Sequence, residues 1–119
     1  MVSVAPITLT AVWTGNLTQG CVTAGPHWNP EGKTHGGPGK EVRHHGDLGN
    51  IVAGEDGKGT LTLTDDKLMI YGELSIVGRS MVCHALEDDL GDGGNDESLK
   101  TGNAGARLAC GVIGLSGPL

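Results

Sequence analysis

The chain has 119 residues, 22 of them glycine, no phenylalanine and a formal net charge of −6. This length predicts a single domain over residues 1–119. The acidic charge argues against nucleic acid and anionic membrane as partners, and no apolar run approaches the roughly 20 residues of a membrane span. Met1–Thr14 lacks the basic and apolar regions of a signal peptide, so we expect a cytoplasmic protein.

Short alternating and β-branched stretches predict an all-β fold. Pro6–Trp13 alternates apolar residues with threonine, which is typical of a strand. Further strands are expected at Asp47–Ala53, Thr60–Thr64 and Ser75–Ala85, with a weak strand or an extended segment at Lys67–Tyr71 and an apolar segment at Arg107–Leu115 that closes the fold. Gly15–Gly25 is rich in turn residues. No stretch shows the period of a helix, although Asp96–Lys100 has the composition for one short helical turn.

Two long loops interrupt these strands, and the first of them, His27–Asp47, carries the strongest chemical signal. It holds four of the five histidines, with His27, His35, His44 and Asp47 in the spacing H-x7-H-x8-H-x2-D. Three imidazoles and a carboxylate can supply a closed tetrahedral zinc site, and a metal would stabilise a loop with little apolar surface. The alternative is a loop of solvated histidines, which we expect for His45. The second long loop is Leu86–Gly105.

Four longer motifs point to a family. They are C-V-T-A-G-P-H-W-N-P (21–30), H-G-G-P (35–38), R-H-H-G-D-L-G-N (43–50) and K-T-G-N-A-G-A-R-L-A-C-G-V-I-G (100–114). Together they resemble the copper/zinc superoxide dismutases, and the resemblance extends from Gly15 to Leu115. It implies an antiparallel Greek-key β-barrel or sandwich with two long functional loops.

The resemblance also implies a set of metal ligands. The residues that match the zinc ligands are His27, His35, His44 and Asp47. His27 also matches the imidazolate that bridges zinc to copper, and His84 matches another copper ligand. Asp88 matches a carboxylate that ties a zinc ligand to a copper ligand. Without the family, His84 reads as a hydrogen-bonded core histidine and Asp88 as a solvated acid.

The substrate path is implied in the same way. Arg107 matches the catalytic arginine that holds the superoxide anion beside copper; by itself it reads as a surface cation. The residues that match the charged loop thought to steer superoxide inward are Asp96, Glu97, Lys100 and Thr101. Such rim charges mainly change association rates.

The three cysteines leave at least one free thiol. In a reducing cytosol all three would be thiols. The resemblance instead implies a disulfide between Cys21 and Cys110, with Cys83 free.

The resemblance fails in the N-terminal segment, residues 1–14. The family carries H-x-H, two copper ligands, before the turn that G-N-L-T-Q-G-C (15–21) fits, and counting back places Thr10 and Val12 at those positions. Copper would keep only His27 and His84, too few for the usual Cu(II) site. The family's first strands also have no counterpart ahead of Pro6, which predicts exposed strand edges.

Two functions remain open. The first is the family's reaction, disproportionation of superoxide to oxygen and hydrogen peroxide at a copper/zinc site, impaired by the missing copper ligands. The second is a non-catalytic zinc-binding domain that pairs with full-length dismutase subunits. A homodimer is the other expected assembly. A copper-chaperone domain is not favoured, because the chain has no C-x-x-C segment.

Overall fold

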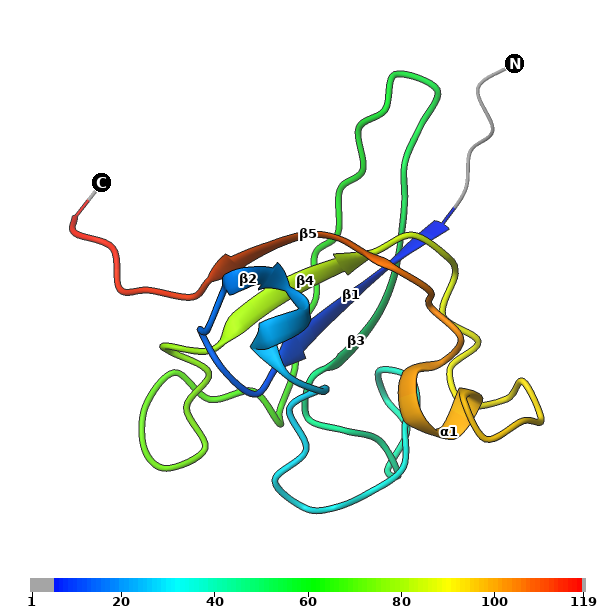
Figure 1. Cartoon of the computed structure of the whole chain (residues 1–119), viewed down its shortest axis with the longest axis horizontal. Helices are drawn as coiled ribbons and strands as arrows, with labels where there is room; N and C mark the ends of the chain where they lie inside the picture. The colour runs from blue at the N-terminus through cyan, green and yellow to red at the C-terminus, as the bar shows by residue number, and fades with distance from the viewer. Residues whose placement is uncertain (1–5, 119) are drawn as a thin grey trace.

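One antiparallel sheet organises the chain in this computed structural model, which describes residues 6–118. Its strands are β1 (Pro6–Val12), β3 (Asp47–Val52), β4 (Ser80–His84) and β5 (Arg107–Val112), in the spatial order β3-β1-β4-β5 (Figure 1). The predicted all-β fold class is therefore confirmed: the chain is mostly β, and the sheet is consistent with one layer of a β-sandwich. Residues 1–5 of the divergent segment lie outside the described part of the chain.

The remaining elements are short and lie around this sheet. Strand β2 (Thr18–Cys21) leads directly into the 3-10 helix η1 (Val22–Ala24), and both lie in front of the sheet in Figure 1. The helix α1 (Ser98–Thr101) is one turn within the second long loop, close to the helical turn expected there. Among residues 6–118, no helix has the length and apolarity needed to cross a membrane.

The strand register gives the sheet two different faces. β1 pairs with β4 from Leu9 opposite Cys83 to Val12 opposite Ser80. Because side chains alternate along a strand, Thr10 and Val12 point to the same face. Val12 is fully buried there and packs with Val82. We call this the loop face, because the long loops and η1 cover it.

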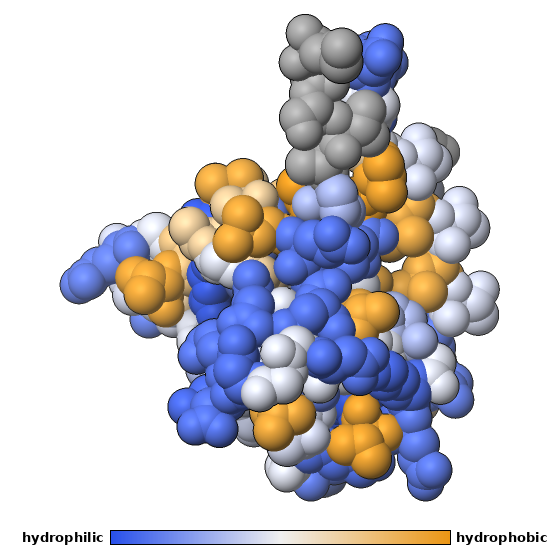
Figure 2. Space-filling view, turned by 90° about the vertical axis from the view of Figure 1, so that its right-hand side faces the viewer, coloured by the Kyte–Doolittle hydropathy of each residue, from blue (hydrophilic) through white to orange (hydrophobic). Residues whose placement is uncertain are grey.

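The opposite face is less well covered, and we call it the open face. It carries the side chains of Ile7, Leu9, Ala11, Ile51, Met81, Cys83 and Ala109. Leu9, Met81 and Cys83 are only half-buried and Ala109 is exposed. Residues 6–118 form no second sheet over it. On the side of the molecule seen in Figure 2, hydrophobic residues reach the surface in several patches.

The strand predicted at Thr60–Thr64 is wrong, and so is the weak-strand alternative at Lys67–Tyr71. Thr60–Thr64 and Lys67–Tyr71 form no strands, and the nearest pairings are single bridges at Gly59 and Met69. A strand needs a neighbour to satisfy its backbone groups, and the four-stranded sheet offers none here. Leu61 and Leu63 consequently stay 40% exposed.

Other boundaries shift for local reasons. The strand expected at Ser75–Ala85 begins only at Ser80, because Gly78 takes a positive φ of 86° that interrupts the extended backbone. Conversely, Thr18–Cys21 was expected to be a turn but is the extended strand β2. It packs beside β5, to which it is covalently joined.

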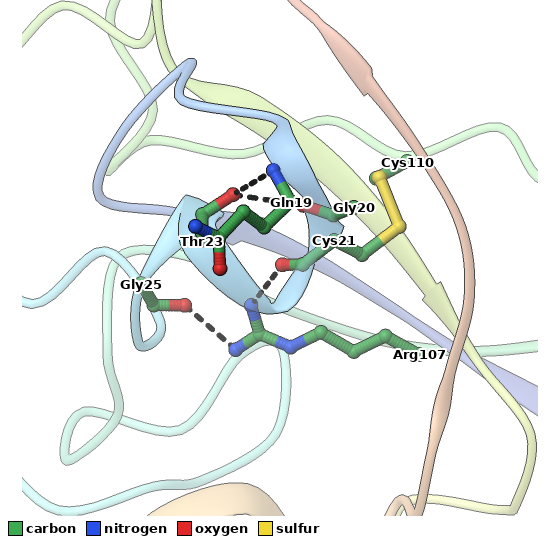
Figure 3. Close-up of a disulfide and its surroundings, with 7 residues drawn as sticks. All are labelled: Gln19, Gly20, Cys21, Thr23, Gly25, Arg107 and Cys110. Atoms are coloured by element: carbon green, nitrogen blue, oxygen red, sulfur yellow. Dashed lines mark hydrogen bonds between the residues drawn. A yellow bond between two sulfur atoms is a disulfide. The ribbon is translucent and has the colours of Figure 1, made fainter.

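That covalent link is the disulfide implied by the resemblance. Cys21 at the end of β2 is bonded to Cys110 in β5, with a Cα–Cα distance of 5.7 Å (Figure 3). Cys83 is a free, half-buried thiol. The disulfide therefore fixes η1 and the start of the histidine loop to the last strand.

Replacing Cys21 and Cys110 together by serine is expected to destabilise the fold. The bridge joins residues 89 positions apart, and closing a loop of that length contributes about 4–5 kcal/mol in the chain-entropy model. Denaturant unfolding of zinc-saturated protein measures the difference. The control Cys83→Ser should change the free energy of unfolding by about 1 kcal/mol or less. Equal stability of the double variant and the unaltered chain would contradict the assignment.

Candidate metal centre

Backbone hydrogen bonds hold the two ends of the histidine loop against the end of β1. The amide of Trp28 donates to the carbonyl of Ala11 at 2.9 Å, and the amide of Ala11 donates to the carbonyl of Gly46 at 2.9 Å. The Gly46 amide donates in turn to Trp28 at 2.9 Å. A side chain at Gly46 would collide with the Ala11 carbonyl, so this closure requires glycine. It brings His27 and His44 to the same place.

Asp47, the first residue of β3, lies at the centre of the cluster. Its Oδ1 lies 2.8 Å from Nδ1 of His27, 3.0 Å from Nδ1 of His35 and 3.2 Å from Nδ1 of His44. The Nδ1 atoms of His27 and His44 lie 3.3 Å apart. All four side chains are buried. The loop therefore gathers the four residues that the spacing and the resemblance singled out.

These distances fit a tetrahedral metal ion. Bonds of roughly 2.0–2.1 Å place the donor atoms of a tetrahedron roughly 3.3–3.4 Å apart. The four separations given above run from 2.8 to 3.3 Å, and all four donor atoms lie within 4.8 Å of one another. Asp47 Oδ2 accepts the amides of Gly36 at 3.0 Å and of His44 at 2.8 Å, which aims Oδ1 at the imidazoles. These three nitrogens and one carboxylate oxygen could hold a metal ion, and such a donor set suits a closed tetrahedral zinc site.

Asp88 sets the tautomer of His35. Its Oδ1 lies 2.6 Å from Nε2 of His35, and a carboxylate only accepts, so Nε2 carries the proton. In the neutral ring the lone pair is then on Nδ1, which is buried and lies 3.0 Å from Asp47 Oδ1. This is the tautomer a metal needs. Asp88 is buried and therefore not the solvated acid of the alternative interpretation. Gly102 packs against it with no room for a Cβ.

The charges of the cluster oppose the effect of burial. Burial lowers the pKa of His27, and hydrogen bonding to Asp47 only partly offsets it. For His35 burial is again the largest single effect, but Asp47 and Asp88 together outweigh it and raise its pKa to about 9. Burial would raise the pKa of Asp47, yet the three imidazoles hold it below its usual range. Metal binding must therefore displace a proton from His35.

His84 approaches the cluster from β4. Its ring centroid lies 5.9 Å from that of His27, so these two candidate copper ligands are neighbours. Its Nδ1 lies 3.3 Å from the carbonyl of Gly105, which can only accept, so Nδ1 carries the proton. Nε2 then accepts from the Thr10 hydroxyl at 3.0 Å. The lone pair that would bind copper is occupied by Thr10.

Val12 and Asp88 also lack the contacts that the resemblance implies for them at a copper site. Val12 lies in the hydrophobic core with Val82 and Ala24. The second oxygen of Asp88, Oδ2, is buried without a hydrogen-bond partner. The link that the resemblance assigns to Asp88 thus reaches His35 and stops there.

Arg107 stands above the cluster at the start of β5. Its guanidinium donates to the carbonyl of Cys21 at 2.9 Å and to that of Gly25 at 2.6 Å (Figure 3). It lines a cleft of about 850 Å³ together with His27 and with Glu97, Lys100 and Thr101 of the second loop. Asp96 is exposed and does not line this cleft. We call the cleft lined by Arg107 and His27 the anion cleft, after the role that the resemblance implies for Arg107.

The comparison with protein families agrees with these features. The model of the copper/zinc superoxide dismutase family (SODC) matches residues 12–113. The chain belongs to the copper/zinc superoxide dismutase family. The match begins at Val12, so Thr10 lies just outside it.

Sequence reasoning missed two supports of this dismutase-type site. Asn50 on β3 accepts the Asp88 amide at 2.8 Å and donates to the Asp88 carbonyl at 3.0 Å. Arg43 is buried, donates to the Asp47 carbonyl at 3.3 Å and pairs with Asp65. The one available signal was an arginine directly before the paired histidines. The expectation of a solvated His45 was wrong: its ring is buried under the loop.

Replacing Asp65 by asparagine is expected to cost about 3–5 kcal/mol at pH 7, because Arg43 would remain as an unpaired buried charge. Burial alone would raise the pKa of Asp65, but hydrogen bonds from Arg43 and from the amides of Lys67 and Leu68 outweigh it and lower that pKa. A lowered folded-state pKa stabilises above the unfolded value of about 3.9 and loses this stabilisation as the pH falls below it.

Unfolding of the two proteins between pH 3 and pH 7 measures this. Their free energies of unfolding should differ most at pH 7 and converge below about pH 4. The exposed neighbour Asp66 is the matched control, and Asp66→Asn should change stability by about 0.5 kcal/mol or less. A difference that does not shrink with falling pH would contradict the role of the ion pair.

Proposed function

We propose that this family member binds zinc at His27, His35, His44 and Asp47 and disproportionates superoxide only weakly. One observation carries the proposal: the hydroxyl of Thr10 occupies Nε2 of His84. Thr10 stands where the family has a copper-binding histidine. Its hydroxyl also occupies Nε2 of His84, the nitrogen with which His84 would bind copper. The zinc half of the site has its full donor set, whereas copper is left with His27 and His84.

The chain's own residues would divide the reaction among them. Copper, where it is bound, supplies the one-electron transfer. Arg107, held by two backbone carbonyls, binds and orients the superoxide anion. His27 Nδ1 faces Asp47 in the proposed zinc site, and the buried Nε2 of His27 has no hydrogen-bond partner. That nitrogen is where a proton can be held for the product. Lys100 at the rim raises the local concentration of the anion.

Metal analysis combined with superoxide consumption tests the proposal. Protein supplied with both metals should contain about one zinc per chain and well below one copper. Its rate constant should lie far under the roughly 10⁸–10⁹ M⁻¹s⁻¹ of a diffusion-limited enzyme. One tightly bound copper with a rate near that limit would refute the weak-activity proposal. Absence of zinc would refute the metal assignment separately.

A second candidate function is favoured by the sheet. The open face has no layer over it among residues 6–118, and the edge strands β3 and β5 expose Val52 (58%) and Leu108 (64%). Exposed edges invite pairing. We therefore propose a non-catalytic alternative, a zinc-bound domain that pairs with a second copy or with full-length dismutase subunits, in the cytoplasm. Light scattering of the chain alone, and of the chain mixed with full-length dismutase subunits, distinguishes the two assemblies. If this chain has the mass of a monomer at every concentration in both experiments, both assemblies are excluded.

A further inference from the structure

The anion cleft is much larger than superoxide requires. Superoxide has two atoms, whereas a volume of about 850 Å³ lies within the roughly 300–1,000 Å³ of sites for small organic molecules. His27 and His44 of the metal cluster are among the residues that line it. The cleft therefore has room for a ligand larger than superoxide beside the metal cluster.

The walls of the cleft are largely apolar. Trp13, Val22, Pro26 and Leu99 line it. Val22 is 74% exposed, Leu99 46% and Trp13 37%. Trp13 is held in place, because its ring meets that of Trp28 edge-on at 4.5 Å and its carbonyl accepts from Arg79 at 2.6 Å. A fixed indole beside exposed aliphatic side chains is a surface for a flat apolar group.

The polar part of the cleft carries a surplus positive charge. Among the residues that the structure describes, Arg107 and Lys100 form no ion pair, whereas Lys33 is neutralised by Glu31 at 2.6 Å. Glu97 contributes one negative charge, and its carboxylate accepts from Thr101 at 2.8 Å. Two unpaired cations and one carboxylate leave a net charge of about +1 in the cleft, which matches a monoanion.

We propose that the anion cleft binds a small aromatic carboxylate. The carboxylate lies on Arg107 and Lys100, and the ring lies against Trp13 and Leu99. The proposal needs the folded, zinc-loaded loop of the proposed function but not its copper. A bound ligand of this kind would cover His27 and exclude superoxide from Arg107, so it would also inhibit any residual dismutase activity.

Titration calorimetry on the zinc-loaded full chain tests both halves of the site. The probes are 2-naphthoate, its uncharged analogue 2-naphthamide, and acetate, which has the charge without the ring. We expect 2-naphthoate to bind at least about tenfold more tightly than either, since the amide lacks the charge-assisted hydrogen bonds and acetate lacks the apolar contact of the ring. Equal binding of the amide, or equal binding of acetate, would overturn the proposal.

Two variants locate the binding. Arg107→Gln should bring the affinity for 2-naphthoate closer to that for 2-naphthamide, with Lys100 retaining part of the preference for the carboxylate. Leu99→Ala should weaken both probes, whereas Leu108→Ala, an exposed leucine on β5 outside the cleft, should leave them unchanged. If Leu108→Ala weakens binding as much as Leu99→Ala, the ligand lies elsewhere and the assignment is wrong.

A measurement on the unaltered protein covers the case in which a variant fails to fold. In NMR spectra, saturating 2-naphthoate should shift the signals of Val22, Leu99 and the Trp13 indole, and not those of Leu108. The reverse pattern would overturn the proposal. Zinc content, measured in the same samples, distinguishes failure of the ligand proposal from failure of the proposed function. If the protein contains zinc but does not bind 2-naphthoate, only the ligand proposal is wrong.

Discussion

Asp47→Ala is expected to abolish tight zinc binding. The carboxylate contacts all three imidazoles through Oδ1 and accepts two backbone amides through Oδ2. Its loss removes one of four donors and leaves two buried amides unpaired, each costing about 1–3 kcal/mol. The zinc affinity should fall by more than the roughly 10–100-fold that follows loss of an outer hydrogen-bond partner.

Competition with a chromogenic chelator measures the affinity, and thermal unfolding at fixed zinc measures the stability. A loss of about 100-fold in affinity removes up to about 2.7 kcal/mol of zinc-dependent stabilisation. Asp47→Asn is one matched control, since it keeps an acceptor for the amides but loses the charge. Asp88→Asn is the other matched control, and it should lower the zinc affinity less than Asp47→Ala does. Unchanged zinc affinity in Asp47→Ala would exclude the proposed site.

Thr10→His is expected to give the largest gain in activity. The imidazole would replace the hydroxyl that now occupies Nε2 of His84, and so would add one copper ligand and release another. Copper bound per chain should rise towards one, with superoxide consumption rising by about tenfold or more, because Cu(II) prefers several nitrogen donors in a tetragonal site.

Thr10→Val separates the two effects of that substitution. It has a similar shape and removes the hydrogen bond to His84 without adding a ligand, so copper uptake should change little. Adding Val12→His should increase copper uptake further but lower stability by about 1–3 kcal/mol, since Val12 is packed in the core. Copper uptake that rises as much with Thr10→Val as with Thr10→His would show that blocking, rather than a missing ligand, is the defect.

The parts of the fold that the sequence predicted are those with a local cause. Alternation located β1, which pairs with β3 on one side and with β4 on the other. It failed at Thr60–Thr64, where the same pattern has no neighbouring strand. Pairing is a property of the assembled sheet, so no local pattern can report its absence.

The candidate site divides in the same way. The resemblance named the zinc donors, and the structure brings them together around Asp47. It could not reveal that Thr10 binds His84, because that contact depends on the register between strands 74 residues apart. The Arg43–Asp65 pair was equally hidden, since either charge alone looks like a surface residue. The Thr10–His84 and Arg43–Asp65 contacts form only when segments distant in the sequence come together in the fold.

The bridge between Cys21 and Cys110 also decides how the molecule behaves when its backbone is cut. Every residue from β3 to α1 lies between the two cysteines. A protease that nicks the exposed turn at Glu55–Gly57 would therefore produce two fragments still joined through sulfur. One carries β1 and β3, the other β4 and β5, and the pairing of β1 with β4 is left in place. The protein is in effect a ring with two short arms, and one nick opens the ring without separating its parts.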